Sequence, residues 1–193
     1  MTKMKRDHMV VGIDSSLTST GICVLFVLGN SKLNMVLTKS KQFATDEERI
    51  KYIATETLKK VREAVGLTGL RHVKWGIEDY SFNVKAGRVR QLAEVGGLIK
   101  QVLWAATGRL PVKINPKTLK KFIVGTGKAA KNQHLLYAYT KWGIKFPNDD
   151  VCDAYAVARL VEAVYMQDQS DLYAYEKECC EAVHKQNPWI LQK

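Results

Sequence analysis

Three apolar segments near the start of the chain, separated by short polar connections, restrict the fold more than any other feature. They cover residues 9–14, 20–28 and 33–38, and each has the length and composition of a β-strand. Short connections join antiparallel neighbours, because parallel neighbours need a crossover of about a dozen residues or more. The first 40 residues or so are therefore expected to form a three-stranded antiparallel meander.

Helices and strands are expected to alternate after this meander. Thr45 begins a capping-box pattern that predicts an amphipathic helix ending at Gly66. Two further strands are expected at residues 73–78 and 110–114, and further helices at residues 86–106, 117–123, 129–142 and 149–165. This order predicts an α/β fold in which a five-stranded mixed sheet combines the meander with parallel strands.

The predicted elements fit one domain spanning residues 1–193. Its core is expected at about residues 9–165, and a helical extension at about residues 167–193, in which no catalytic motif is visible. In the long predicted helix, Gly96 and Gly97 are adjacent. Glycine is costly inside a helix, so this pair predicts the close approach of another backbone or of a partner.

The charge of the chain favours a polyanionic partner. It has 30 Lys and Arg residues against 19 Asp and Glu, a formal net charge of +11. Such an excess is typical of proteins that bind nucleic acid. The alternative is a protein that is simply basic, since net charge describes association and not fold.

The cysteines and the apolar segments give expectations about location. The four cysteines are Cys23, Cys152, Cys179 and Cys180. They lack the paired spacing of a zinc site, and an adjacent pair is unsuited to a structural disulfide, so reduced thiols in a cytoplasmic protein are expected. No signal-peptide core and no membrane-spanning run is visible, so no membrane partner is expected.

Two of the predicted strands end in an acidic residue within a similar setting. Gly12-Ile13-Asp14 and Gly76-Ile77-Glu78 each place a glycine two positions before the acid, on the same strand face. If these strands pair, the two carboxylates lie side by side, about 5 Å apart, above a floor without side chains.

Two further acids, Asp150 and Asp153, are three residues apart on a predicted helix and so lie on one face. A carboxylate cluster is unfavourable unless a cation neutralises it, and oxygen ligands suit Mg²⁺. The four acids therefore indicate a divalent metal site that acts on a polyanion. Taken singly, each has another interpretation: Asp14 as a loop cap, Glu78 or Asp79 as a strand-end charge, and Asp149 or Asp150 as an N-terminal helix charge.

Several short motifs occur in a characteristic order. They are Gly12-Ile13-Asp14, Thr20-Gly21, Ile77-Glu78, the helix with Gly96-Gly97, Ile123-Val124-Gly125-x-Gly127-x-Ala129-x-Lys131-x-Gln133, and Asp150-Val151-Cys152-Asp153-Ala154-x-Ala156. Over about residues 9–165 this series resembles the RuvC family of Holliday junction resolvases. The resemblance implies a ribonuclease H-like fold, a homodimer, and Mg²⁺-dependent nicking of two strands of a four-way DNA junction.

The resemblance also implies roles for individual residues. The metal-binding acids correspond to Asp14, Glu78, Asp150 and Asp153, which would hold two Mg²⁺ ions, with Mn²⁺ as a substitute, and no small-molecule cofactor is implied. The active-site lysines correspond to Lys131 and Lys120, whose charge would act on the scissile phosphate. Lys117 and Lys121 lie close to Lys120 in the sequence, so this second assignment stays open.

Aromatic and basic residues after the second acid predict DNA contacts. Tyr80 and Phe82 flank Ser81 where the family carries one aromatic, and either ring is a candidate for stacking on an unpaired base or for the core. The basic residues expected at DNA phosphates are Lys85, Arg88, Arg90, Lys117, Lys121 and Lys128, with Lys113 nearby. For any one of them a solvated charged face is the alternative.

The sequence departs from the family at the first motif, where Asp14-Ser15-Ser16 replaces Asp-Pro-Gly. This leaves the following loop less tightly determined, and with the altered aromatic stretch it extends the expected substrates to flaps, forks and other branched DNA. Two other functions stay open. The segment from Asp14 to Gly21 also resembles the phosphate loop of actin-like ATPases and phosphotransferases, and a non-catalytic junction-binding protein would keep the fold alone.

Overall fold

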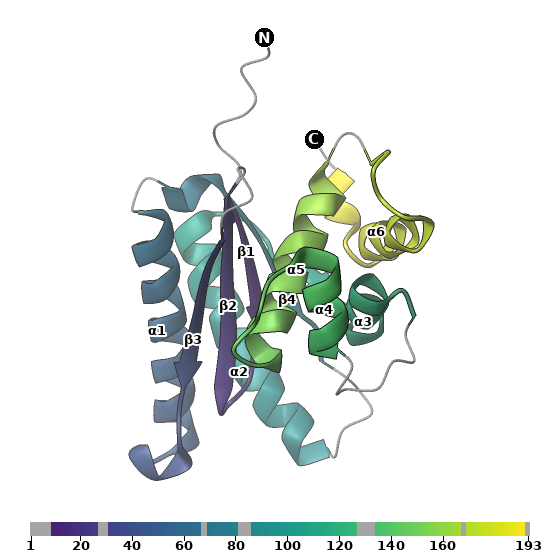
Figure 1. Ribbon diagram of the computed structural model, residues 1–193. Helices are drawn as coiled ribbons and strands as arrows, with labels where there is room; N and C mark the ends of the chain where they lie inside the picture. The colour runs from purple at the N-terminus through teal and green to yellow at the C-terminus, as the bar shows by residue number, and fades with distance from the viewer. Residues whose placement is uncertain are drawn as a thin grey trace.

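The computed structural model describes residues 9–26, 31–66, 69–80, 86–126, 134–166 and 169–191. A central β-sheet separates two layers of helices (Figure 1). Within these ranges no helix is both long enough and apolar enough to span a bilayer.

The sheet has five strands, in the order β3-β2-β1-β4-β5. The strands are β1 (Met9–Asp14), β2 (Ser19–Phe26), β3 (Ser31–Leu37), β4 (Val73–Glu78) and β5 (Val112–Ile114). β1, β2 and β3 pair antiparallel, whereas β4 runs parallel to both β1 and β5. The predicted meander and the predicted mixed sheet are both confirmed.

The α-helices of the described ranges are α1 (Asp46–Val65), α2 (Ala86–Thr107), α3 (Pro116–Val124), α4 (His134–Trp142), α5 (Asp149–Tyr165) and α6 (Ala174–Gln186). Side-chain caps fix several starts, since Thr45, Asn115 and Asn148 each accept a backbone N–H of the first turn. The predicted start of α4 at residue 129 lies outside the described residues. Among the described residues, the 3₁₀ helices Ser40–Gln42, Gly69–His72 and Pro188–Leu191 were not expected.

Alternation along β1 separates the two faces of the sheet. Val11 and Ile13 belong to the core shared with α1 and α2, whereas Val10 belongs to the core shared with α3, α5 and α6. Since strand side chains alternate, Gly12 and Asp14 lie on the α5 face with Val10. The same alternation on β4 places Gly76 and Glu78 on that face, because Trp75 and Ile77 belong to the α1–α2 core.

Glycines on this face allow the backbone of α5 to approach the sheet closely. A Cβ atom added at Gly12 would lie 2.0 Å from the carbonyl oxygen of Ala154, and one at Gly21 would lie 2.0 Å from that of Asp150. A Cβ at Gly76 would lie 2.4 Å from Cγ2 of Val161. The floor without side chains that the sequence predicted is therefore present, and α5 packs directly on it.

The adjacent glycines in α2 differ from each other. A Cβ at Gly96 would lie 2.6 Å from Oη of Tyr80, so the predicted close approach is made here by a side chain. A Cβ at Gly97 would meet no described atom within 4 Å.

The C-terminal segment is part of the packed structure. Helix α6 contacts α3, α5 and β5, and it contains the buried residues Cys179 and Cys180. Beyond its end, the buried side chain of Asn187 accepts the N–H of Lys113 at 2.9 Å and donates to the Lys113 carbonyl at 2.8 Å. The segment thus pairs with the outer edge of β5. All four cysteines are buried and free, as the expectation of reduced thiols requires.

Candidate metal centre

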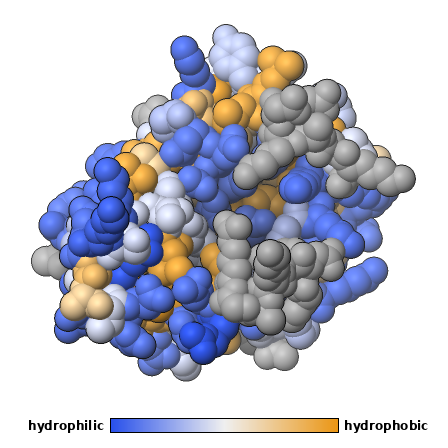
Figure 2. Space-filling model, turned by 90° about the horizontal axis from the view of Figure 1, so that it is seen from below, coloured by the Kyte–Doolittle hydropathy of each residue, from blue (hydrophilic) through white to orange (hydrophobic). Residues whose placement is uncertain are grey.

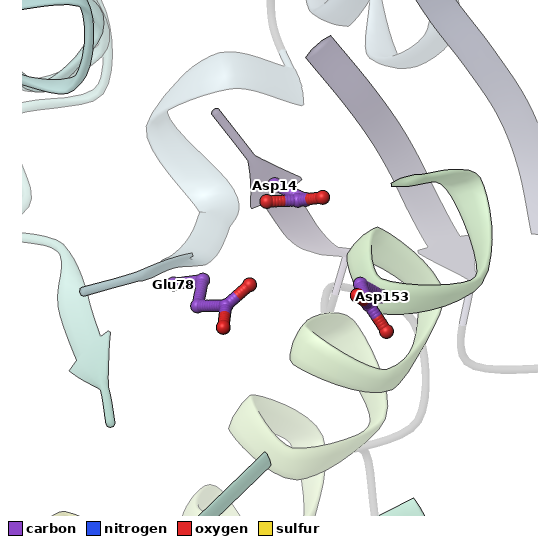
Figure 3. A group of neighbouring side chains, drawn as sticks. All are labelled: Asp14, Glu78 and Asp153. Atoms are coloured by element: carbon purple, nitrogen blue, oxygen red, sulfur yellow. The ribbon is translucent and has the colours of Figure 1, made fainter. Parts of the chain in front are cut away.

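Three of the predicted acids converge at one end of the sheet. Asp14 ends β1, Glu78 ends β4, and Asp153 lies in the second turn of α5. One carboxylate oxygen from each lies within 4.8 Å of the others, and Figure 3 shows the three side chains gathered around a common space. The two strands are parallel neighbours, so their carboxyl ends meet at the same edge, and the close approach of α5 over Gly12 supplies the third acid.

The structure distinguishes the acids that the sequence left open. Glu78 belongs to the group Asp14, Glu78 and Asp153, which we call the triad. Asp79 instead accepts hydrogen bonds from Gln186 at 2.9 Å and from the Tyr80 backbone N–H at 3.0 Å. Asp150 lies in the first turn of α5, before the triad member Asp153, and is not one of the three grouped carboxylates. Its assignment as a fourth ligand stays a prediction.

The environment of Glu78 opposes its ionisation in the metal-free protein. Burial and the negative charge of Asp153 raise the pKa of its carboxyl from 4.5 to about 7, although a hydrogen bond with Asp14 and the charge of Lys120 act in the opposite direction. A cation bound by the three acids would remove this penalty. The donor set, carboxylate oxygens alone, fits a hard divalent ion.

This shift predicts that metal affinity depends on pH. Glu78 holds a proton below about pH 7 and must release it to act as a ligand, so affinity for Mn²⁺ is expected to rise by up to about tenfold per pH unit up to pH 7 and then level off. In the metal-free protein, the stabilisation from the raised pKa is present below about pH 4.5 and lost as the pH rises through 7. Calorimetric titration with Mn²⁺ at several pH values measures the effect. An affinity independent of pH between about 6 and 8 would contradict it.

His134, the first residue of α4, adds a contact that the sequence analysis missed. Its side chain is buried, and its Nδ1 atom lies 3.2 Å from Oδ1 of Asp153. The sequence held one signal that His134 is buried. His134 and Ala138 are four residues apart, so they lie on the same face of the helix, and both are buried. A single histidine within the predicted helix 129–142 gave no reason to expect an acidic partner on another helix.

Of the predicted lysines within the described ranges, Lys120 acts electrostatically on Glu78. It is exposed on α3, and its positive charge lowers the pKa of Glu78. Neighbouring Lys121 forms an ion pair with Glu178, and Lys117 is exposed in the first turn of α3. These observations favour Lys120 among the three. Lys131 lies outside the described residues.

The predicted DNA contacts are only partly described. Tyr80 packs on α2, donates a hydrogen bond from its hydroxyl to the Ala93 carbonyl at 3.2 Å, and has Lys100 above its ring at 4.9 Å. Arg90 has an exposed side chain 3.5 Å from Glu94. Phe82, Lys85 and Lys128 lie outside the described residues, as does the side chain of Arg88. Figure 2 views the molecule from below, the end at which β1 terminates in Figure 1, and hydrophilic side chains cover much of this face.

The loop after Asp14 is held by hydroxyl groups. Thr20 Oγ1 donates to the carbonyl of Ser16 at 2.8 Å, and Ser16 Oγ accepts the N–H of Thr18 at 3.1 Å. These bonds take the place of a proline and glycine in defining the turn. The loop is therefore better determined than the altered motif suggested.

Known proteins resemble this chain in sequence pattern and in fold. The family model described as crossover junction endodeoxyribonuclease RuvC matches residues 10–160. The structure of T. thermophilus RuvC in complex with Holliday junction substrate is 22% identical, with a TM-score of 0.62, over 78% of this chain and 90% of that one. A second Thermus thermophilus RuvC structure is 20% identical, with a TM-score of 0.60, over 92% of this chain and 95% of that one. No curated protein gave a match. The structural likeness confirms the predicted ribonuclease H-like fold.

Proposed function

Because this chain belongs to the RuvC family of crossover junction endodeoxyribonucleases, we propose that Asp14, Glu78 and Asp153 bind the divalent ions with which it resolves Holliday junctions. The observation that carries the proposal is the convergence of three carboxylates from β1, β4 and α5 within 4.8 Å. Family membership establishes a junction-resolving endonuclease. Which residues bind the metal is what we propose in addition to the family's activity.

The expected ion is Mg²⁺, replaceable by Mn²⁺, with two ions in each site and Asp150 as a fourth ligand. When bound, such ions supply the positive charge that activates a water and stabilises the leaving oxygen in phosphodiester hydrolysis. The protein itself excludes bulk water from one side of the site, since Glu78 and Asp153 are partly buried and α5 packs tightly on Gly12.

Lys120 is proposed to hold the scissile phosphate. Lys120 is exposed, so a substrate can reach it, and its positive charge lowers the pKa of the Glu78 carboxyl. A cation at the mouth of an acidic site offsets the repulsion between the carboxylates and a phosphate. Lys131 is retained in the same role on the strength of its motif alone.

The remaining DNA contacts are proposed in line with the sequence analysis. The exposed residues Arg90 and Lys117, with Lys85, Arg88 and Lys128, would contact phosphates without reading bases. Lys121 is a weaker member of this set, because Glu178 neutralises it. The packing of Tyr80 on α2 favours Phe82 as the ring that stacks on an unpaired base.

A homodimer would place two such sites on one four-way junction. No described atom lies within 4 Å of a Cβ added at Gly97, which leaves room for a partner on this part of α2. Trp104, further along the same helix, is a large apolar residue with 47% of its surface exposed. A monomer in sedimentation at micromolar concentration would contradict this part of the proposal. A single-domain organisation, a cytoplasmic location and activity on flaps or forks also stay predictions.

Divalent ions are expected to control nicking of a labelled four-way junction. EDTA should abolish the paired nicks, Mg²⁺ or Mn²⁺ should restore them, and either ion should raise the melting temperature, because it binds the folded state. Cleavage that persists in EDTA would contradict the metal site. Metal-independent binding without any nicking would favour the non-catalytic alternative, and tight ATP binding without DNA affinity would favour the phosphotransferase alternative.

A further inference from the structure

The contact between His134 and Asp153 joins two helices beside the metal centre. His134 lies at the start of α4, and Asp153 lies in the second turn of α5. The imidazole is buried, with 8% of its side chain exposed, and Nδ1 lies 3.2 Å from Oδ1 of the carboxylate. One turn later on the same face of α4, Ala138 is completely buried. The contact is therefore part of the α4–α5 packing and is shielded from water.

Nδ1 of His134 lies beside one of the two oxygens of the Asp153 carboxylate. An N–H group that donates to Oδ1 would restrict rotation of the Asp153 side chain. Such a restraint matters here because Asp14, Glu78 and Asp153 lie within 4.8 Å and repel one another when ionised. Without a donor behind it, Asp153 has rotamers that turn it away from the other two acids.

We propose that His134 is a positioning residue that donates from Nδ1 to Oδ1 of Asp153 and holds this carboxylate in the orientation that binds a divalent ion. The inference rests on the proposed metal site. It assigns to α4 a part in catalysis that its sequence did not indicate, since the element otherwise contributes an exposed surface with Leu136, Tyr137 and Tyr139.

Two substitutions separate hydrogen bonding from packing. His134→Asn places an amide nitrogen where Nδ1 lies and keeps the donor but loses ring volume. His134→Phe keeps the ring and loses the donor. The Phe variant is expected to weaken Mn²⁺ affinity and slow cleavage, each by about 10-fold to 100-fold, whereas the Asn variant should stay within about threefold of the unchanged protein in both.

Mn²⁺ affinity is measured by calorimetry on the full chain, nicking on a labelled junction, and junction binding in EDTA. Binding in EDTA should not change, because the donor acts on the metal ligand and not on DNA. His184→Phe, on the distant helix α6, controls for the introduction of a phenyl ring. If His134→Phe does not fold, His134→Leu gives the same comparison with a smaller side chain.

Equal losses in the Asn and Phe variants would overturn the proposal and leave His134 a packing residue. Unchanged metal affinity in the Phe variant would also overturn it. Asp14→Asn distinguishes this failure from failure of the metal site. If Asp14→Asn is inactive while His134→Phe cleaves normally, only the role of His134 is lost. If Asp14→Asn cleaves normally, the metal site itself is wrong.

Discussion

Asp153→Asn is expected to slow junction cleavage by about a thousandfold or more, a loss of about 4 kcal/mol of transition-state stabilisation, while junction binding changes little. Asparagine has nearly the same shape and keeps an oxygen beside Nδ1 of His134, which lies 3.2 Å from Oδ1 of Asp153. What it removes is one of three negative charges within 4.8 Å, and with it a ligand for the ion. Single-turnover nicking in Mg²⁺ and binding in EDTA measure the two effects separately.

Asp149→Asn is the matched control for this substitution. It removes the same charge from the same helix, but Asp149 is not a member of the triad. Its cleavage rate is expected to stay within about threefold, the range of a surface charge. Asp150→Asn then tests the fourth ligand, because a loss comparable to that of Asp153→Asn would assign it to the site. Normal cleavage by Asp153→Asn would contradict the proposed metal centre.

Gly12→Ala is expected to destabilise the folded protein by about 3 kcal/mol or more, at the upper end of the cost of overpacking a core. The new methyl group would lie 2.0 Å from the carbonyl oxygen of Ala154 and 2.5 Å from the backbone nitrogen of Ala158. Backbone atoms in the middle of a helix cannot turn aside, so α5 must shift as a whole. Because α5 also carries Asp153, cleavage by the remaining folded protein should fall by at least about tenfold.

Gly97→Ala provides the comparison, since it adds the same methyl group to a site where no described atom lies within 4 Å. Alanine is favoured over glycine inside a helix by up to about 1 kcal/mol, so this variant should be as stable as the unchanged protein or slightly more stable. Urea unfolding of both variants tests the prediction. Equal stabilities would mean that α5 does not pack on Gly12 as described. A dimer lost in Gly97→Ala alone would locate the partner at this residue.

Local patterns in the sequence were sufficient to predict most of the fold. Thr45, Asn115 and Asn148 each begin a helix through a side-chain N-cap, which acts within one turn and so is visible in the sequence. The two-residue period of strands predicted that Asp14 and Glu78 would lie side by side if their strands paired, and the parallel pairing of β1 with β4 meets that condition.

Contacts between helices were not predictable in this way. The three-residue spacing placed Asp150 and Asp153 on one face of α5, but how that helix lies on the sheet decides which carboxylate reaches the strand ends. The carbonyl of Asp150 packs over Gly21, and the carboxylate that joins Asp14 and Glu78 is that of Asp153. The approach of His134 from α4 depends on tertiary packing and has no local pattern at all. The same is true of Lys121, whose partner Glu178 lies 57 residues away.

The pairing of Asn187 with β5 has a consequence for how the protein behaves at high concentration. An open edge strand presents free N–H and C=O groups on which a strand of another molecule can add. Here the side-chain amide of Asn187 takes up both backbone groups of Lys113, the middle residue of the shortest strand in the sheet. A strand from another molecule could therefore add to this edge of the sheet only after displacing the buried side chain of Asn187.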